Sequence, residues 1–142
     1  MNKLVVGDAD AIIAQANAED SNHDRAVKIA QVLVGSQVNV IYPVTAVAEA
    51  VTHIQRVFNS GATAFGTAQL MVDPAVQVVE VNKQTLTRAL NYFSPTASKK
   101  NTLFDCIVAA VAQEYKADAI FSFDHFYETH GFTLASELTG RN

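Results

Sequence analysis

The sequence predicts an α/β fold, a three-layer α/β/α sandwich built around a central parallel sheet. Short, wholly apolar segments alternate with amphipathic segments from one end of the chain to the other. Strands that are apolar throughout are typical of parallel sheets, because helices cover both faces of such sheets. The chain has 142 residues. A domain commonly has about 150 residues, so we expect residues 1–142 to form a single domain.

Five elements are expected in the first half of the chain. In order, they are a strand over Leu4–Val6, a helix from Asn22 to about Leu33, a strand over Val38–Tyr42, a helix that starts at Pro43, and a helix from Gly61 to about Met71. Gly7 ends the first strand, and Ser21 or Asn22 can cap the first of these helices. Proline is favoured in the first turn of a helix, and the apolar residues after Pro43 recur at helical spacing.

The second half of the chain continues the alternation. The expected elements are a strand over Val76–Val81, a helix over Gln84–Phe93, a loop over Ser94–Asn101, a helix over Leu103–Tyr115, a strand over Ala119–Phe121, and a fifth strand after Gly131. The helix over Leu103–Tyr115 has the clearest pattern, because its bulky apolar residues fall on one stripe. We find no internal repeat and no low-complexity tract that would indicate another architecture.

Composition excludes several classes of protein. Hydrophobic residues make up 49% of the chain, which is too many for a disordered protein. No apolar run approaches the roughly 20 residues of a membrane-spanning helix. Lys and Arg number 10 and Asp and Glu number 14, and the net charge of −4 argues against a broad basic surface that coats nucleic acid. Cys106 is the chain's one cysteine, so no internal disulfide can form and a cytoplasmic location is expected.

Two of the predicted strands lead into an aspartate. Asp8 follows the strand that begins at Leu4, and Asp124 follows the strand that begins at Ala119. Because parallel strands have their carboxyl ends at one edge of the sheet, both carboxylates are expected at that edge, where ligands bind in open α/β sheets. The structural alternative is that each aspartate begins a turn or caps the next helix.

Asp10 and Glu49 are further candidates, each with a structural alternative. Asp10 precedes the apolar run Ala11–Ala14 and suits the N-cap of a helix as well as it suits a site. Glu49 lies in mid-helix among alanines and valines, where it belongs either to an exposed face or to a site. His53 and Arg56 follow Glu49 at spacings of four and seven residues, which places all three on one side of the helix. An ordinary helical histidine is the favoured interpretation of His53.

Asp105 lies in the first turn of the most apolar helix. It comes three residues after Thr102, so the pair predicts a capping box with Asp in place of Glu. A cap alone accounts for the residue but does not explain a carboxylate in such apolar surroundings. Cys106 beside it is expected to be a small buried residue rather than a nucleophile.

The acids named so far favour one kind of metal chemistry. Carboxylate oxygens are suited to Mg²⁺ or Mn²⁺ rather than to zinc, and the four histidines have no zinc-ligand spacing. The phosphate-binding loop, the dinucleotide-binding glycine motif and the G-x-S-x-G motif are all absent from the sequence. The commonest NTPase, dehydrogenase and serine-hydrolase classes are therefore not indicated.

Four acidic segments follow one another along the chain. They are Leu-Val-Val-Gly-Asp8-Ala-Asp10-Ala-Ile-Ile, Pro43-Val-Thr-Ala-Val-Ala-Glu49-Ala-Val, Thr102-Leu-Phe-Asp105-Cys-Ile-Val-Ala-Ala-Val-Ala and Ile120-Phe-Ser-Phe-Asp124-His-Phe. Taken together, they resemble the PIN-domain ribonucleases, and their length, order and spacing are similar to those of the VapC-type toxins of toxin–antitoxin pairs. The resemblance extends from Lys3 to about Phe132.

The resemblance implies a function as well as a fold. It implies a Mg²⁺- or Mn²⁺-dependent endoribonuclease that hydrolyses RNA phosphodiester bonds. The metal-binding and catalytic residues would be Asp8, Glu49, Asp105 and Asp124, with Ser122 as a supporting hydroxyl. Asp10 stands where the family usually has Ser, Asn or Thr, and is a candidate fifth ligand. The implied partners are RNA, a cognate antitoxin and a second copy of the chain in a homodimer, with no membrane partner.

An acidic site needs cationic neighbours to hold RNA. Lys99 and Lys100, in the loop before the helix of Asp105, are the first candidates for RNA binding, and Arg56 is the next. The alternative for the two lysines is that they only keep the surface soluble.

Two other function classes stay open. Asp8-Ala-Asp10 has the D-x-D pattern of haloacid dehalogenase-type phosphatases, which use an aspartyl nucleophile, although the usual Gly-Thr after the second aspartate is missing. The other class is a catalytically inactive PIN-like module that binds RNA or protein. A trapped phospho-aspartate would favour the first, and RNA binding without metal-stimulated cleavage would favour the second.

Overall fold

A four-stranded parallel sheet forms the centre of the molecule. The computed structural model describes residues 2–96 and 99–140. Its strands are β1 (Leu4–Gly7), β2 (Asn39–Pro43), β3 (Gln77–Val79) and β4 (Ala119–Phe121), in the spatial order β3-β2-β1-β4. All three neighbouring pairs are parallel. The chain therefore moves outward from β1 to β3 and returns to β4 on the other side of β1, so strand order reverses at β1 and β4.

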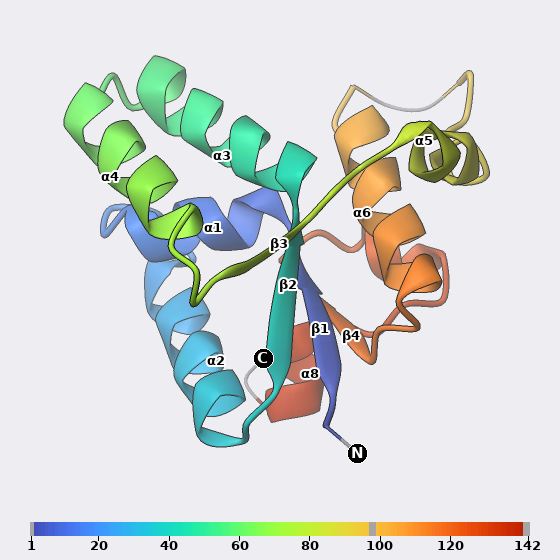
Figure 1. The fold of residues 1–142 in the computed structure, drawn as a ribbon, viewed down its shortest axis with the longest axis horizontal. Coiled ribbons are helices and arrows are strands. Elements are labelled where there is room, and N and C mark those ends of the chain that lie inside the picture. The colour runs from blue at the N-terminus through green and yellow to red at the C-terminus, as the bar shows by residue number, and fades with distance from the viewer. Residues whose placement is uncertain (1, 97–98, 141–142) are drawn as a thin grey trace.

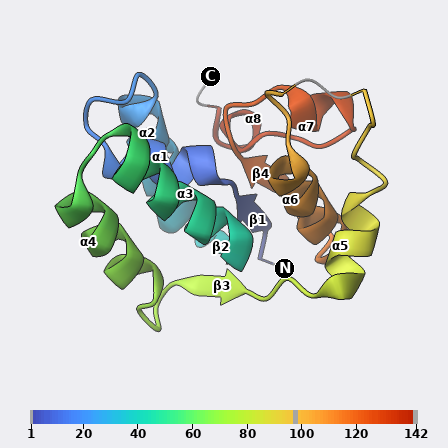
Figure 2. The ribbon, with the colours of Figure 1, turned by 90° about the horizontal axis from the view of Figure 1, so that it is seen from above.

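Helices cover both faces of this sheet. They are α1 (Ala9–Ala16), α2 (His23–Gly35), α3 (Val44–Val57), α4 (Gly61–Met71), α5 (Lys83–Ala89), α6 (Leu103–Glu114), α7 (Phe126–Thr129) and α8 (Ala135–Thr139). Figure 1 shows α1 to α4 on one side of the strands and α5 and α6 on the other. Seen from above, α3 lies alongside α4, and α6 lies across the sheet from them (Figure 2). This is the predicted three-layer α/β/α arrangement. No described helix is long and apolar enough to cross a bilayer.

Alternating side chains of β1 tie the layers together. Val5 packs in a cluster with α1, α2 and α8, whereas Val6 packs in a cluster with α6 on the opposite face, and both valines are fully buried. Successive strand residues point to opposite faces, so an apolar pair such as Val5 and Val6 fits only a strand covered on both sides. A third apolar cluster joins α1 to α3 and α4.

Most of the predicted elements are confirmed, with shifted ends. The helix expected over Gln84–Phe93 ends at Ala89, and the loop expected over Ser94–Asn101 contains residues 97–98, which lie outside the described residues. The fifth strand expected after Gly131 is wrong. That segment makes a single parallel bridge, between Leu134 and Ile120, and then turns into α8. Leu134 is the N-cap of α8, so the chain enters that helix directly after the bridge and no strand forms.

The close packing at the end of β1 gives a stability prediction. A Cβ at Gly7 would overlap the ring of Tyr42. We expect Gly7→Ala to lower the free energy of unfolding by about 1–3 kcal/mol, as overpacking does. Gly66→Ala is the matched control, because nothing lies within 4 Å of a Cβ at this position in the middle of α4.

Urea denaturation of both variants measures the effect. The free energy of unfolding of Gly66→Ala should rise by about 1 kcal/mol, because alanine has a higher helix propensity than glycine. An unchanged stability in Gly7→Ala would contradict the tight contact between β1 and Tyr42.

Candidate active site

Asp8 lies at the carboxyl end of β1, where strand order reverses. Its backbone N–H continues the pairing with β4 by donating to the Phe121 carbonyl (3.0 Å). Its side chain is only 3% exposed. Oδ2 accepts a hydrogen bond from the Tyr127 hydroxyl (2.6 Å), and Oδ1 accepts from the Ala9 N–H (2.6 Å). The carboxylate is therefore fixed within the protein, at the place that the strand pattern predicts.

Asp10 lies in the first turn of α1 and does not cap it. The N-cap alternative is wrong, because the N-cap of α1 is Asp8. Oδ2 of Asp10 accepts from the Ser122 hydroxyl and from the Phe123 N–H, both at 2.8 Å. The first turn of α1 points toward the segment after β4, and so this side chain ties that segment to α1.

Ser122 and Asp124 lie in the segment after β4. The Ser122 hydroxyl donates to Asp10, and its oxygen accepts from the Asp124 N–H (3.1 Å). Asp124 accepts from the Asn101 amide at Oδ2 (2.9 Å) and from the Phe126 N–H at Oδ1 (2.9 Å). The expected supporting role of Ser122 thus has a geometric basis, since one hydroxyl holds two of the acidic segments together.

Asp105 is in the first turn of α6, as predicted. Its Oδ2 accepts from the Thr102 N–H (3.0 Å) in a capping box, so the capping interpretation is confirmed. The residue is also buried (9% exposed). Cys106 beside it is buried as expected and packs in the core. Asp105 therefore caps the helix and also carries a carboxylate toward the sheet edge.

Glu49 lies on α3, across the sheet from the Asp105 helix α6. Its side chain is half-buried, and its Oε1 atom is fully buried with no hydrogen-bond partner among the described residues. Oδ1 of Asp10 is a second buried carboxylate oxygen without a partner there. An unsatisfied buried oxygen is costly, so each marks a position where a positively charged ligand would be stabilised.

The five carboxylates repel one another across this edge. Burial raises the pKa of Asp8 well above its usual range, and the charges of Asp10 and Asp105 raise it further. Burial raises the pKa of Asp10 to about 6, against hydrogen bonds from Phe123 and Ser122 that lower it. Burial, followed by the charges of Asp105 and Asp10, raises the pKa of Glu49 to about 7. These effects show that acids from separate elements share one electrostatic environment.

Asp105 and Asp124 belong to the same environment. Burial raises the pKa of Asp105, and the Asp124 carboxylate raises it further, while the hydrogen bond from Thr102 lowers it. Asp124 also raises the pKa of Asp10. The ion pairs that the structure shows among described residues, Arg88–Glu114 and His125–Glu128, include none of the five acids.

The chemical type of the side chains at this edge suits a hard divalent cation. These side chains offer carboxylate oxygens, the ligands that Mg²⁺ and Mn²⁺ prefer, and two of these oxygens are buried without partners. Within residues 2–96 and 99–140, no three His, Cys, Asp or Glu side chains are already arranged as a metal site. The carboxylates would thus have to draw together around an ion, against their mutual repulsion.

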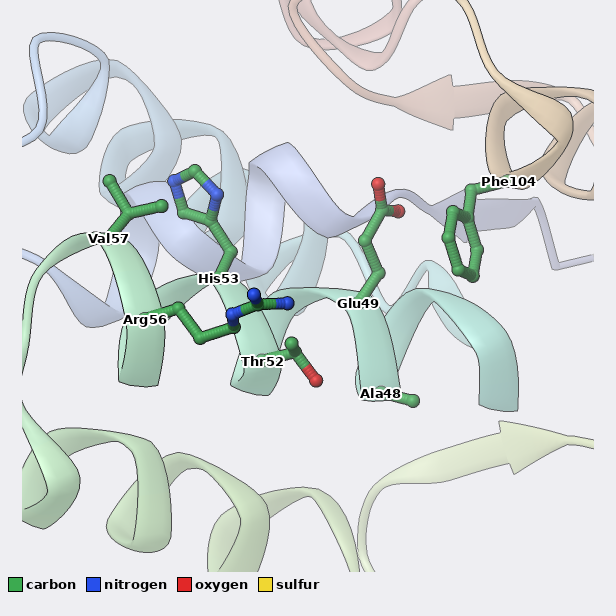
Figure 3. A pocket seen from close by; sticks show the side chains of 7 residues that line it. All are labelled: Ala48, Glu49, Thr52, His53, Arg56, Val57 and Phe104. Carbon is green, nitrogen blue, oxygen red and sulfur yellow. The ribbon is translucent and has the colours of Figure 1, made fainter.

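A pocket of about 520 Å³ adjoins the acids. Glu49, Thr52, His53, Arg56 and Val57 of α3 line it, with Phe104 of α6 opposite Glu49 (Figure 3). The prediction that Glu49, His53 and Arg56 share one side of the helix is confirmed. His53 contacts the Phe58 ring edge-on (5.3 Å between centroids). Lys99 and Lys100 are exposed in the turn just before α6.

Two residues at the acidic edge escaped the sequence prediction. Tyr127 is fully buried and donates to Asp8, and burial together with the Asp8 charge raises its pKa well above 10, so it stays a donor. Asn101 donates to Asp124. In the sequence, the only indication of a role for Tyr127 was a phenol among the apolar residues after β4. Asn101 gave none, because it lies in an irregular loop.

Comparisons with known proteins agree with this geometry. A family model for the PIN domain matches residues 5–130. The crystal structure of VapC20 from Mycobacterium tuberculosis, described as a sarcin-ricin loop cleaving toxin, has a similar fold, with a TM-score of 0.77 and 20% sequence identity over 91% of this chain and 96% of that one. No curated protein matches the chain.

The buried acids predict an unusual dependence of stability on pH. Asp10 and Glu49 take up protons near pH 6 and 7 in the folded chain, well above the values of about 4 in an unfolded chain. Between about pH 4 and pH 7, the folded state holds more protons than the unfolded state. The free energy of unfolding therefore falls as the pH rises through this interval. Below about pH 4 this contribution is fully present.

Thermal unfolding in EDTA tests this dependence. We expect a higher Tm at about pH 5 than at about pH 8, and a smaller difference in Asp10→Asn. A Tm that rises over the same interval would contradict the mutual repulsion of the acids.

The hydrogen bond from Tyr127 to Asp8 gives a second prediction. Tyr127→Phe removes the hydroxyl that donates to the buried Oδ2 atom of Asp8. We expect this loss to lower the free energy of unfolding by about 1–3 kcal/mol. Urea denaturation at neutral pH should show that loss. Tyr92→Phe is the matched control, because it removes an exposed hydrogen bond to Gln113 and should cost well under that amount. Equal losses in the two variants would mean that the bond to Asp8 is unimportant.

Proposed function

The chain belongs to the PIN-domain family, and from that premise we propose that it is a Mg²⁺- or Mn²⁺-dependent endoribonuclease that hydrolyses RNA phosphodiester bonds. The observation that carries the proposal is the gathering of carboxylates from β1, α3 and α6 at the reversal of strand order, with buried oxygens of Asp10 and Glu49 left without partners among the described residues. A phosphodiester is an anion, so such an acidic site suits it only with cations present.

Asp8, Glu49, Asp105 and Asp124 would hold the divalent ion, with Asp10 as an additional ligand. When bound, the ion would lower the pKa of a water molecule and offset charge on the phosphate. The surrounding neutral donors position the ligands: Tyr127 holds Asp8, and Asn101 holds Asp124. Ser122 holds Asp10 while leaving that residue's Oδ1 atom available. Outer partners of this kind orient metal ligands in many enzymes.

Cationic residues beside the acids would hold the RNA. Lys99 and Lys100 stand before α6, whose first turn carries Asp105, and Arg56 stands in the pocket that Glu49 lines. Their charges would meet the phosphates on either side of the acidic centre. The net charge of −4 makes these local contacts, rather than a broad basic face, the basis of RNA binding.

We further propose that the ribonuclease is the toxin of a toxin–antitoxin pair. The similarity in fold to VapC20, a toxin that cleaves the sarcin-ricin loop, supports this role over that of a housekeeping nuclease. A cognate antitoxin would cover the acidic centre with a cationic segment. We also propose that the protein acts in the cytoplasm as a homodimer and as a single domain in each copy.

The phosphatase alternative is not supported. The family model that matches the chain is that of the PIN domain, which is a different family. A catalytically inactive module that binds RNA or protein is separated from the proposal by the cleavage assay below.

Cleavage of RNA by purified protein tests the proposal. Asp8→Asn and Asp105→Asn should each reduce cleavage by about a hundredfold or more, since even the outer partners of metal ligands can cost that much. Asp73→Asn is the matched control, an exposed aspartate in the turn after α4, and should retain full activity. EDTA should stop cleavage, and Mg²⁺ or Mn²⁺ should restore it.

A thermal shift on the same samples gives a readout of ion binding. Mn²⁺ should raise the Tm of the wild-type protein and of Asp73→Asn, but not that of Asp8→Asn. RNA binding without cleavage in the wild-type protein would select the inactive module instead.

A further inference from the structure

The pocket beside the acidic centre has a division of charge along its length. Glu49 lines one end, next to the other acids, and Arg56 lies seven residues further along α3. At 1.5 Å per residue, this spacing is about 10 Å along the helix axis. His53 lies between them on the same side. Figure 3 shows Glu49 and His53 pointing away from α3, whereas the Arg56 side chain runs along the helix toward Thr52.

Two residues of the pocket, Arg56 and Phe104, offer groups to which a ligand could bind. Arg56 makes no hydrogen bond or ion pair in the part of the chain that the structure describes. Phe104 is 42% exposed in the first turn of α6, and its ring stacks on no other ring among the described residues. A cation and an exposed aromatic face that share one hollow form a surface on which a nucleobase and its phosphate can bind.

We propose that this pocket is a subsite for one unpaired nucleotide of the RNA, its base on the Phe104 ring and its phosphate on the Arg56 guanidinium. The inference rests on the proposed function, because it places this nucleotide next to the bond that the acidic centre cleaves. Phe104 directly precedes Asp105 in the chain, so the base platform and a carboxylate of the centre move together as one helical turn.

Charge complementarity favours this occupant over a protein segment. A basic peptide would be attracted to Glu49 and repelled by Arg56, whereas a nucleotide strand can place a phosphate at Arg56 and another at the cation-binding acids. The pocket's volume, about 520 Å³, lies within the range of small-ligand sites. An unpaired base is required, since a base inside a duplex does not offer its face for stacking.

The absence of tryptophan from the sequence allows a direct test of stacking. Phe104→Trp would carry the protein's only indole, and a base stacked on it should quench its fluorescence. The probe is a 2′-O-methyl oligoribonucleotide of about eight nucleotides, titrated in Mg²⁺. Phe65→Trp is the matched control, a 67% exposed position on α4 outside the pocket. We expect quenching in the first variant and none in the second.

Fluorescence anisotropy with the same labelled probe tests both contacts in variants without tryptophan. Phe104→Ala should weaken binding about fivefold to a hundredfold, the range for loss of one base stack. Arg56→Gln should reduce the slope of log affinity against log salt by about 0.7, as loss of one phosphate contact does. Lys28→Gln, an exposed cation on α2, should leave that slope unchanged. Circular dichroism checks that each variant is folded.

The outcomes separate this inference from the proposed function. If the wild-type protein cleaves RNA but Phe104→Trp is not quenched and Arg56→Gln keeps its salt slope, the subsite is wrong and the ribonuclease stands. Quenching without cleavage supports the subsite and rejects the ribonuclease. Quenching as strong with a fully duplex probe overturns the inference.

Discussion

The burial of like charges at the carboxyl end of a parallel sheet is the constraint on which the rest of this molecule depends. Asp8 is almost fully enclosed, and its neighbours in space are other carboxylates rather than cations. Folding must bring these acids together although burial raises the pKa values of Asp8, Asp10 and Asp105 there. The apolar packing of β1 on both faces, through Val5 and Val6, supplies the stability that makes this possible.

The side-chain hydrogen bonds that hold Asp8, Asp10 and Asp124 among the described residues come from neutral donors. Tyr127 donates to Asp8, Ser122 to Asp10 and Asn101 to Asp124, and none of the three adds a charge. A buried ion pair would hold a carboxylate as firmly, but it would also satisfy the charge that a metal ion needs. These three donors therefore position the acids without adding positive charge of their own. If two divalent ions bound, they would add +4 to the net charge of −4 and bring it to zero.

The sequence predicted the place of a site residue wherever a regular strand or helix pattern leads up to that residue. Asp8 and Asp124 follow apolar strands, and Asp105 follows a capping threonine, so a regular element sets the place of each. Tyr127 could not be found in this way, because α7 has four residues and shows no pattern. Asn101 lies in a loop, and its bond to Asp124 depends on how two irregular segments meet. For Asp10, local propensity suggested a cap, whereas long-range bonds to Ser122 and Phe123 decide its role.

The contrast between local sequence pattern and long-range packing also explains why a fifth strand was expected after Gly131 and did not form. Apolar residues after Gly131 are compatible with a strand, and one bridge to Ile120 does form. The segment then has to begin α8, which packs on α2 and closes that face of the sheet. A strand there would extend the sheet but would leave the apolar side of α2 exposed. Covering both faces of the sheet therefore takes precedence over lengthening its edge, and a pocket stays open between Glu49 of α3 and Phe104 of α6.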